Sequence, residues 1–255
     1  MKTGAIAICG LSVIPVRAKP DDTSEIVTQL LFGEKIEYLE IQNQWIKVEI
    51  AHDQYVGWID HKQVLELSDN SSFLLHPPSQ YQQEAALKLE TPWGIQTILK
   101  GSPILSPSKN FTIDGYQFKW IDSEPKQYSK DIIELAKSYL NAPYLWGGRT
   151  PFGIDCSGFS QTVYHQIGYR LNRDASQQVL QGSPIHFEEQ KPGDLAFFAS
   201  EKTGNITHVG IILPEHKIIH AHGRVRIDTL NEKGIFNEKK AYYSHQFHSI
   251  RRYDI

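Results

Sequence analysis

Three residues in the second half of the chain, Cys156, His208 and His220, have the side-chain types that nucleophilic catalysis requires. A cysteine nucleophile needs a base within hydrogen-bonding reach, and that base needs a third group to orient it. His208 and His220 lie on two apolar stretches that we expect to form neighbouring antiparallel strands. Their even spacing is compatible with both imidazoles facing the same side of the sheet.

The sequence after Cys156 predicts a helix that begins at this residue. Phe159, Val163 and Ile167 are four residues apart, and Gly168 directly follows the last of them. A thiol at a helix N-terminus lies at the positive end of the backbone dipole, which favours the thiolate. The alternative is a small buried cysteine, as most lone cysteines are.

A second alternative for Cys156, His208 and His220 is a metal site. Zinc sites usually contain closer ligand pairs, such as C-x-x-C or H-x₃-H, and these three residues include none. Their order and spacing therefore favour catalysis, with no metal and no organic cofactor expected. We expect the following histidines to be surface or packing residues: His165, His186, His216 and His222.

The composition is that of an ordinary globular protein: 255 residues, 40% hydrophobic and 22% charged, with a formal net charge of −3. The slightly acidic balance without a basic run argues against nucleic acid or a membrane as the main partner. No stretch approaches the ~20 apolar residues of a membrane span. The two cysteines, Cys9 and Cys156, stand in dissimilar contexts, which favours a free thiol over a disulfide framework.

The first sixteen residues read as a β-strand rather than a signal peptide. The apolar run is interrupted by Gly10, Ser12 and Pro15, and Lys2 is the only charged residue that precedes it. No small-x-small cleavage site follows. We therefore expect a cytoplasmic protein.

The pattern of elements predicts three domains. Short alternating segments with turn residues between them indicate a small β-barrel over 1–66. A polar, proline-containing linker over 66–80 leads to a second, degenerate barrel that ends at 126, in which Asp114-Gly115 forms a hairpin turn. Four tryptophans are assigned to the barrel cores: Trp45, Trp58, Trp93 and Trp120.

Residues 127–255 predict an α+β domain, because helices come first and antiparallel strands follow. Ser129 is expected to cap a first helix. Its apolar face is predicted to consist of Ile132, Ile133, Ala136, Tyr139 and Leu140.

Five motifs in this last domain carry a resemblance to a known family. They are Tyr144-x-Trp146-Gly147-Gly148, Asp155-Cys156-Ser157-Gly158-Phe159, Lys191-Pro192-Gly193-Asp194-Leu195, His208-Val209-Gly210-Ile211 and Ile219-His220-Ala221. In this order they resemble the NlpC-type cysteine peptidases of bacterial cell walls. Residues 1–65 resemble a bacterial SH3-like domain, and the whole chain is similar to the γ-D-glutamyl-L-diamino acid endopeptidases, also called dipeptidyl-peptidase VI.

The resemblance implies a papain-like α+β fold in which the cysteine-bearing helix packs on an antiparallel sheet. It also implies catalytic roles. Cys156 attacks the amide, His208 is the general base, His220 orients it, and Tyr144 supports the oxyanion.

The substrates implied are short peptidoglycan peptides, L-Ala-γ-D-Glu-L-diamino acid, with a free N-terminus and with lysine or diaminopimelate as the diamino acid. The SH3-like domain would wall off one end of the groove, and the chain is expected to be a monomer. For Asp155, capping of the helix is an alternative role. Ala175 stands where many members of the family have a serine, so Ser176 is an alternative source of the hydroxyl contact with the substrate. The implied substrate-binding residues are Glu25, Tyr55, Trp146, Asp155, Ser157, Asp174 and Ala175.

Two other functions remain open from the sequence. One is an enzyme with the same fold that hydrolyses intact cell wall or another amide. The other is a wall-binding protein whose SH3-like domains carry the function, although such a protein has no need of all three of Cys156, His208 and His220.

Overall fold

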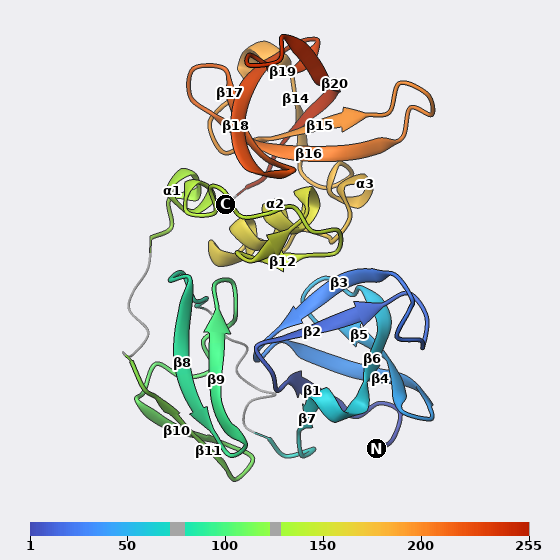
Figure 1. The fold of residues 1–255 in the computed structure, drawn as a ribbon, viewed down its shortest axis with the longest axis vertical. Coiled ribbons are helices and arrows are strands. Elements are labelled where there is room, and N and C mark those ends of the chain that lie inside the picture. Colours follow the sequence, from blue (N-terminus) through green and yellow to red (C-terminus); the bar gives the residue numbers. More distant parts are fainter. Residues whose placement is uncertain (72–79, 123–128, 255) are drawn as a thin grey trace. The chain divides into compact units, whose positions relative to one another are not determined.

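The computed structural model describes residues 1–71, 80–122 and 129–254 (Figure 1). The chain forms two compact units, Met1–Tyr128 and Ser129–Ile255. Most of the predicted linker and the predicted boundary at 126 lie outside the described residues. Among the residues described, no helix is long and apolar enough to cross a membrane.

The first unit begins with a seven-stranded antiparallel sheet in the order β3-β2-β6-β5-β4-β1-β7. Its alternating sequence places apolar residues such as Ile14, Val16 and Val48 in a fully buried core. The N-terminal residues lie in this sheet, but they form two strands, Ile6–Cys9 and Val13–Arg17, rather than the one predicted. The elements are β1 Ile6–Cys9, β2 Val13–Arg17, β3 Ile26–Leu31, β4 Lys35–Gln42, β5 Trp45–Ile50, β6 Val56–Asp60, the 3₁₀ helix η1 His61–Gln63, and β7 Val64–Glu66.

The first unit also contains a four-stranded antiparallel sheet in the order β10-β11-β8-β9. Asp114 and Gly115, with φ of 49° and 83°, form the predicted turn between β10 and β11. Leu89, Phe118 and Trp120 of this sheet share one core with Ile8 and Phe32 of the first. That the segment is a second SH3-like barrel stays a prediction. The strands are β8 Ala86–Thr91, β9 Gly94–Leu99, β10 Asn110–Ile113 and β11 Tyr116–Trp120.

One tryptophan was assigned wrongly. Trp93 is 42% exposed, whereas Trp45, Trp58 and Trp120 are buried. Trp93 directly precedes β9, at the turn of the β8–β9 hairpin, and its ring meets Tyr116 and Phe118 edge-on. A side chain at a hairpin turn is covered on one side only, so the aromatic type alone does not decide its burial.

The second unit has the α+β order that the sequence predicts, with helices before most of the strands. Asp131 rather than Ser129 caps the first helix, accepting the backbone N–H groups of Ile133 and Glu134. That helix ends at Lys137, so Leu140 lies beyond it and is 41% exposed, contrary to the predicted apolar face. The elements are α1 Ile132–Lys137, β12 Arg149–Thr150, β13 Gly153–Ile154, α2 Cys156–Gln166, α3 Ala175–Gln178, β14 Ser183–Ile185, the 3₁₀ helix η3 Phe187–Glu189, β15 Leu195–Ala199, β16 Ile206–Leu213, β17 Lys217–His222, β18 Arg224–Asn231, β19 Gly234–Asn237 and β20 Tyr242–Arg252.

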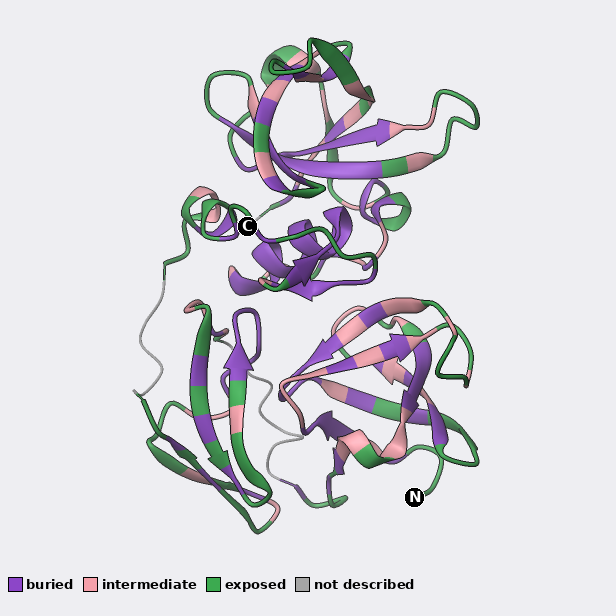
Figure 2. Ribbon diagram, in the orientation of Figure 1, coloured by how far each residue is buried: buried purple, intermediate pink, exposed green. Residues whose placement is uncertain are grey.

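The large sheet of this unit closes on itself. Its order is β14-β20-β15-β16-β17-β18-β19, and β20 also pairs with β19 (Figure 1). One face of the strands encloses a small core that includes Phe198, Ile212 and Ile218. The other face packs on α2, which is buried along its whole length (Figure 2). This is the predicted arrangement of a cysteine-bearing helix on an antiparallel sheet.

Two leucines of the second unit test where its core lies. Leu171 is 1% exposed within the core beneath α2, and Leu180 is 81% exposed. We expect Leu171→Ala to lower the free energy of unfolding by about 2–5 kcal/mol, because the mutation leaves a cavity. The matched control Leu180→Ala should stay within about 0.5 kcal/mol of the unmutated protein. Urea unfolding measures both, and equal effects would contradict this placement of the core.

Candidate active site

The loop that carries Tyr144 is held between two β-segments. Tyr144 donates its backbone N–H to the carbonyl of Gly223 at 3.0 Å and forms a parallel bridge with Ile154. The loop then turns tightly against β13. A Cβ on Gly148 would lie 2.4 Å from the carbonyl oxygen of Gly153, so only glycine fits there. The glycines of the motif therefore place Tyr144 beside the start of α2.

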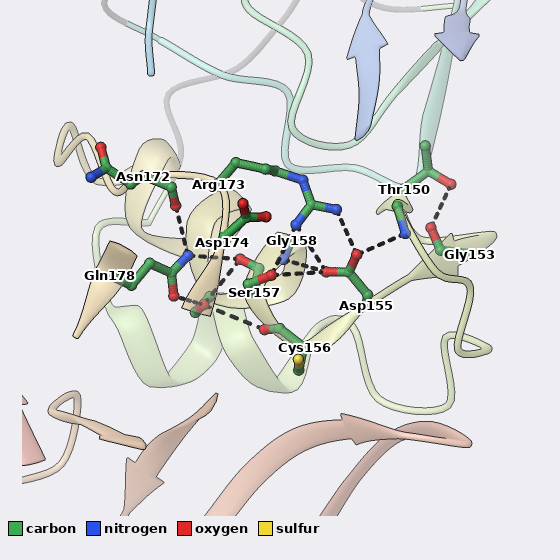
Figure 3. Close-up of polar contacts among 12 residues, drawn as sticks. Thr150, Gly153, Asp155, Cys156, Ser157, Gly158, Asn172, Arg173, Asp174 and Gln178 are labelled. Atoms are coloured by element: carbon green, nitrogen blue, oxygen red, sulfur yellow. Dashed lines mark hydrogen bonds and ion pairs between the residues drawn. The ribbon is translucent and has the colours of Figure 1, made fainter. Parts of the chain in front are cut away.

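Asp155 fixes the start of α2 (Figure 3). Its Oδ1 accepts the backbone N–H of Gly158 at 2.7 Å, which makes it the N-cap of the helix, and its Oδ2 accepts the N–H of Gly147 at 2.8 Å. The same carboxylate binds the buried guanidinium of Arg173 through both oxygens. Arg173 also donates to the hydroxyl of Ser157 at 2.9 Å. One carboxylate thus joins the glycine loop, the helix and the segment before α3.

Cys156 is the first residue of α2 and is 7% exposed. The backbone N–H groups of Val209 and Ser157 both hydrogen-bond to its sulfur. Val209 directly follows His208 in β16, so the sulfur lies against the strand next to the proposed base. In Figure 3 the sulfur points away from the Arg173–Asp155 pair, toward the strands drawn beneath it.

The structure corrects the expectation of a thiolate at Cys156. Burial, together with the negative charge of Asp155, raises the pKa of the Cys156 thiol to about 12, against the hydrogen bonds from the backbone. The effect of desolvation therefore exceeds that of the helix dipole. Cys156 is therefore a thiol at neutral pH, and as a nucleophile it would need a base to remove its proton.

The two predicted histidines meet as the sequence spacing suggested. Strands β16 and β17 are antiparallel, with Ile211 opposite Ile219, so residues 208 and 220 share one face of the sheet. His208 Nε2 lies 2.8 Å from His220 Nδ1, and both rings are buried. Gly210 leaves room for this pair, since a Cβ there would lie 2.9 Å from the Cβ of His220.

A carboxylate on the next strand completes the chain of hydrogen bonds. His220 Nε2 lies 3.0 Å from Oδ2 of Asp228 in β18, and Arg226 also binds this carboxylate. Burial opposes ionisation of Asp228, but the hydrogen bonds from His220 and Arg226 outweigh it and lower its pKa. Asp228 is therefore ionised, and its carboxylate accepts hydrogen bonds but donates none.

An accepting Asp228 determines where the protons lie on both imidazoles. Burial lowers the pKa of His220 and of His208, so both rings are neutral at pH 7. His220 then donates Nε2–H to Asp228, which leaves its Nδ1 to accept Nε2–H from His208. The unprotonated nitrogen of His208 is consequently Nδ1, and a general base needs such a lone pair.

Two further histidines lie beside this pair. The ring of His245 in β20 stacks on His208 with a centroid distance of 3.9 Å and an interplanar angle of 19°. The ring of His222 lies 4.9 Å from that of His245. His222 is exposed, as the sequence analysis predicted for a surface residue.

Comparisons with known proteins identify the families that the two regions of the chain match. Residues 141–246 match the model of the NlpC/P60 family, and residues 16–64 match the bacterial dipeptidyl-peptidase Sh3 domain. The chain is 30% identical to a γ-D-glutamyl-L-lysine dipeptidyl-peptidase of Bacillus subtilis, over 77% of this chain and 72% of that protein. It is 26% identical to dipeptidyl-peptidase 6 of Lysinibacillus sphaericus, over 85% of this chain and 88% of that one.

This chain belongs to the NlpC/P60 family. It is a cysteine peptidase, and therefore a hydrolase. An NlpC/P60 family protein from Bacillus cereus has the same fold, with a TM-score of 0.79 at 21% identity over 97% of this chain and 99% of that one.

The substrate-binding residues expected of an NlpC/P60 enzyme divide between the two units. Trp146 is 61% exposed on its loop, so it is not the core aromatic that its type would allow. Asp174 is the N-cap of α3, and Ala175, the first residue of that helix, is buried.

Two more of the expected substrate residues, Glu25 and Tyr55, lie in the first unit. Glu25 is exposed, and Tyr55 packs against the barrel core. The roles predicted for the substrate-binding residues, including Asp155 and Ser157, stay predictions.

Three residues of the NlpC/P60 domain that belong to the candidate site are not predicted from the sequence: Arg173, Asp228 and His245. Asp228 had a usable signal, because residues 226 and 228 alternate with apolar residues on the strand next to His220. Arg173 and His245 had no such sequence signal. Their partners, Asp155 and His208, lie 18 and 37 residues away in sequence and meet them only in the folded protein.

The protonation of Cys156 is directly testable by alkylation with iodoacetamide. With a raised thiol pKa, the rate should climb about tenfold per pH unit between about pH 6 and pH 9, without a plateau. The second thiol, Cys9, is fully buried and is removed by Cys9→Ala. A rate that is already high and constant at low pH would show a thiolate–imidazolium pair instead.

Proposed function

We propose that this peptidase hydrolyses the bond between D-glutamate and an L-diamino acid, lysine or diaminopimelate, in peptidoglycan stem peptides that begin with a free L-Ala. The observation that carries the proposal is the hydrogen-bond chain from Asp228 through His220 to His208, because Val209, the residue after His208, donates its backbone N–H to the sulfur of Cys156. Such a chain would supply the oriented base that amide hydrolysis by a cysteine enzyme requires.

The first half of the reaction forms a thioester. Cys156 Sγ attacks the γ-carbonyl carbon of D-glutamate while its proton passes to Nδ1 of His208. The imidazolium that results is stabilised through His220 by the ionised Asp228. When the C–N bond breaks, His208 returns the proton to the departing amine.

The negative charge on the carbonyl oxygen requires donors that stay protonated. Burial, with Cys156 and Asp155 nearby, raises the pKa of Tyr144 to about 12, so its phenol keeps its proton at neutral pH. Tyr144 and the backbone N–H of Cys156 are the proposed pair of donors. In the second half a water molecule attacks the thioester, His208 takes its proton, and Cys156 leaves as a thiol.

Recognition of the free N-terminus is proposed for Asp174, which would hold the ammonium group, with Trp146 as an apolar wall. The roles predicted for Glu25 and Tyr55 of the first unit stay predictions. The support is the match of residues 16–64 to a dipeptidyl-peptidase Sh3 domain and the names of the Bacillus relatives. Recognition of a free N-terminus favours soluble peptides over cross-linked wall, so we propose a role in recycling cell-wall fragments, by a monomer in the cytoplasm.

Asp228 provides a test of the proton chain. We expect Asp228→Ala to lower kcat by about 10- to 100-fold with little change in KM, because His220 is then free to hold its proton on Nδ1. Asp228→Asn should lose less, since its amide oxygen still accepts. The control Glu238→Ala removes an exposed carboxylate that pairs with Lys217. A kcat for Asp228→Ala equal to that of the control would remove Asp228 from the mechanism.

The substrate class is tested with two peptides, L-Ala-γ-D-Glu-L-Lys and its N-acetylated form. We expect cleavage of the free amine only, because acetylation removes the charge that Asp174 would bind, and Cys156→Ala should abolish it. Equal cleavage of both peptides would contradict recognition of the N-terminus but keep the chemistry of Cys156. Turnover of purified sacculi would favour a hydrolase of intact wall. Binding to sacculi without any turnover would favour the wall-binding alternative.

A further inference from the structure

Three histidines from three strands of the closed sheet converge on one point. They are His208 of β16, His220 of β17 and His245 of β20. One ring nitrogen of each lies within 4.8 Å of the corresponding nitrogen of the other two. Two of the rings are fully or almost fully buried, and the third is half-buried and stacked on His208. Such a convergence of nitrogen donors is the arrangement that transition-metal ions bind.

We propose that His208, His220 and His245 form a site for a divalent transition-metal ion of the Zn²⁺ type, and that its occupation switches the peptidase off. Three imidazoles select zinc, nickel or copper over magnesium and calcium, which prefer oxygen donors. Three protein ligands also leave a fourth position for water. The inhibitory effect rests on the proposed function of His208, whereas binding of the ion does not.

The distances require only small side-chain movements. At Zn–N distances of about 2.0–2.1 Å, the nitrogens of a tetrahedral site lie about 3.4 Å apart. His208 Nε2 and His220 Nδ1, now 2.8 Å apart, would separate slightly, and the nitrogen of His245 would approach them.

The surroundings of His220 already suit a metal ligand. A histidine that binds a metal usually donates its other N–H to a carboxylate, which fixes the tautomer and the ring. His220 Nε2 lies 3.0 Å from Asp228, so its Nδ1 lone pair faces His208. The carboxylate that orients the proton chain would therefore also support the ion.

Binding would inhibit by moving one proton. In the metal-free enzyme His208 carries its proton on Nε2 and accepts at Nδ1. An ion bound at Nε2 displaces that proton, which returns through solvent to Nδ1 of the same ring. The lone pair that would take the proton of Cys156 is then occupied, so attack on the substrate stops although the nucleophile is untouched.

A route for the ion is present at His245. This residue lines a surface pocket of about 690 Å³, together with two carboxylates and two lysines, Glu201, Glu232, Lys202 and Lys233. The pocket therefore gives a small ion access from solvent to the ring of His245, with no net charge on its lining to repel it. Cys156 is not among the three proposed ligands, so the site differs from a Cys-His-His metal site.

The test measures binding without relying on activity. Co²⁺, which reports its ligands by visible absorption, is titrated into the full-length Cys156→Ala variant, followed by competition with Zn²⁺. We expect one bound Co²⁺ per chain with a spectrum that lacks a sulfur charge-transfer band. Loss of binding in Cys156→Ala would overturn the proposal in favour of a thiolate site.

Two substitutions on β20 test the ligand set. His245→Phe keeps a ring over His208 but removes the donor nitrogen, and should weaken Co²⁺ binding by about tenfold or more. The matched control His248→Phe alters an exposed histidine of the same strand and should bind as the parent does. Equal affinity of His245→Phe and parent would overturn the proposal, and His245→Gln provides a second variant should the first fail to fold.

Activity separates this inference from the proposed function. Zn²⁺ should inhibit the unmutated enzyme reversibly, with EDTA restoring the rate, and His245→Phe should need about tenfold more Zn²⁺ relative to its own uninhibited rate. Co²⁺ binding without any cleavage of L-Ala-γ-D-Glu-L-Lys would remove the proposed function and keep the site. Cleavage that Zn²⁺ does not affect would remove the inhibitory switch.

Discussion

The carboxylate of Asp155 is the constraint on which the rest of the active site depends. It caps α2, receives the N–H of Gly147 from the glycine loop, and binds Arg173 through both oxygens. Each of these donors is buried or nearly so, and an unpaired charge there would be costly. Cys156 follows directly in the chain, so its position is set by groups that take no part in the chemistry.

The closed sheet supplies the second half of the site by a different means. Antiparallel register places His208, His220 and Asp228 on one face of three successive strands, where their side chains reach one another in sequence order. The ionised carboxylate fixes the tautomer of both imidazoles. His208, the proposed general base, is therefore oriented by a carboxylate on a strand that lies two places away from its own.

Burial has opposite consequences for the two reacting groups. It raises the pKa of Cys156 and lowers that of His208, so both are neutral before substrate binds. A neutral histidine is a good base, and it is also a good metal ligand. The same features that would prepare His208 for its proposed role as a base, together with the stacked ring of His245, suit the proposed binding of a transition metal.

The sequence by itself determined the family, the α+β order, the helix that begins at Cys156 and the shared face of His208 and His220, because these follow from periodicity and local motifs. It assigned Trp93 to a core and Cys156 to a thiolate, and both were wrong, because burial depends on what the rest of the chain places around a residue. Arg173, Asp228 and His245 entered the site only through tertiary structure. Their partners come from other strands and loops, and the closing of the sheet decides which side chains meet.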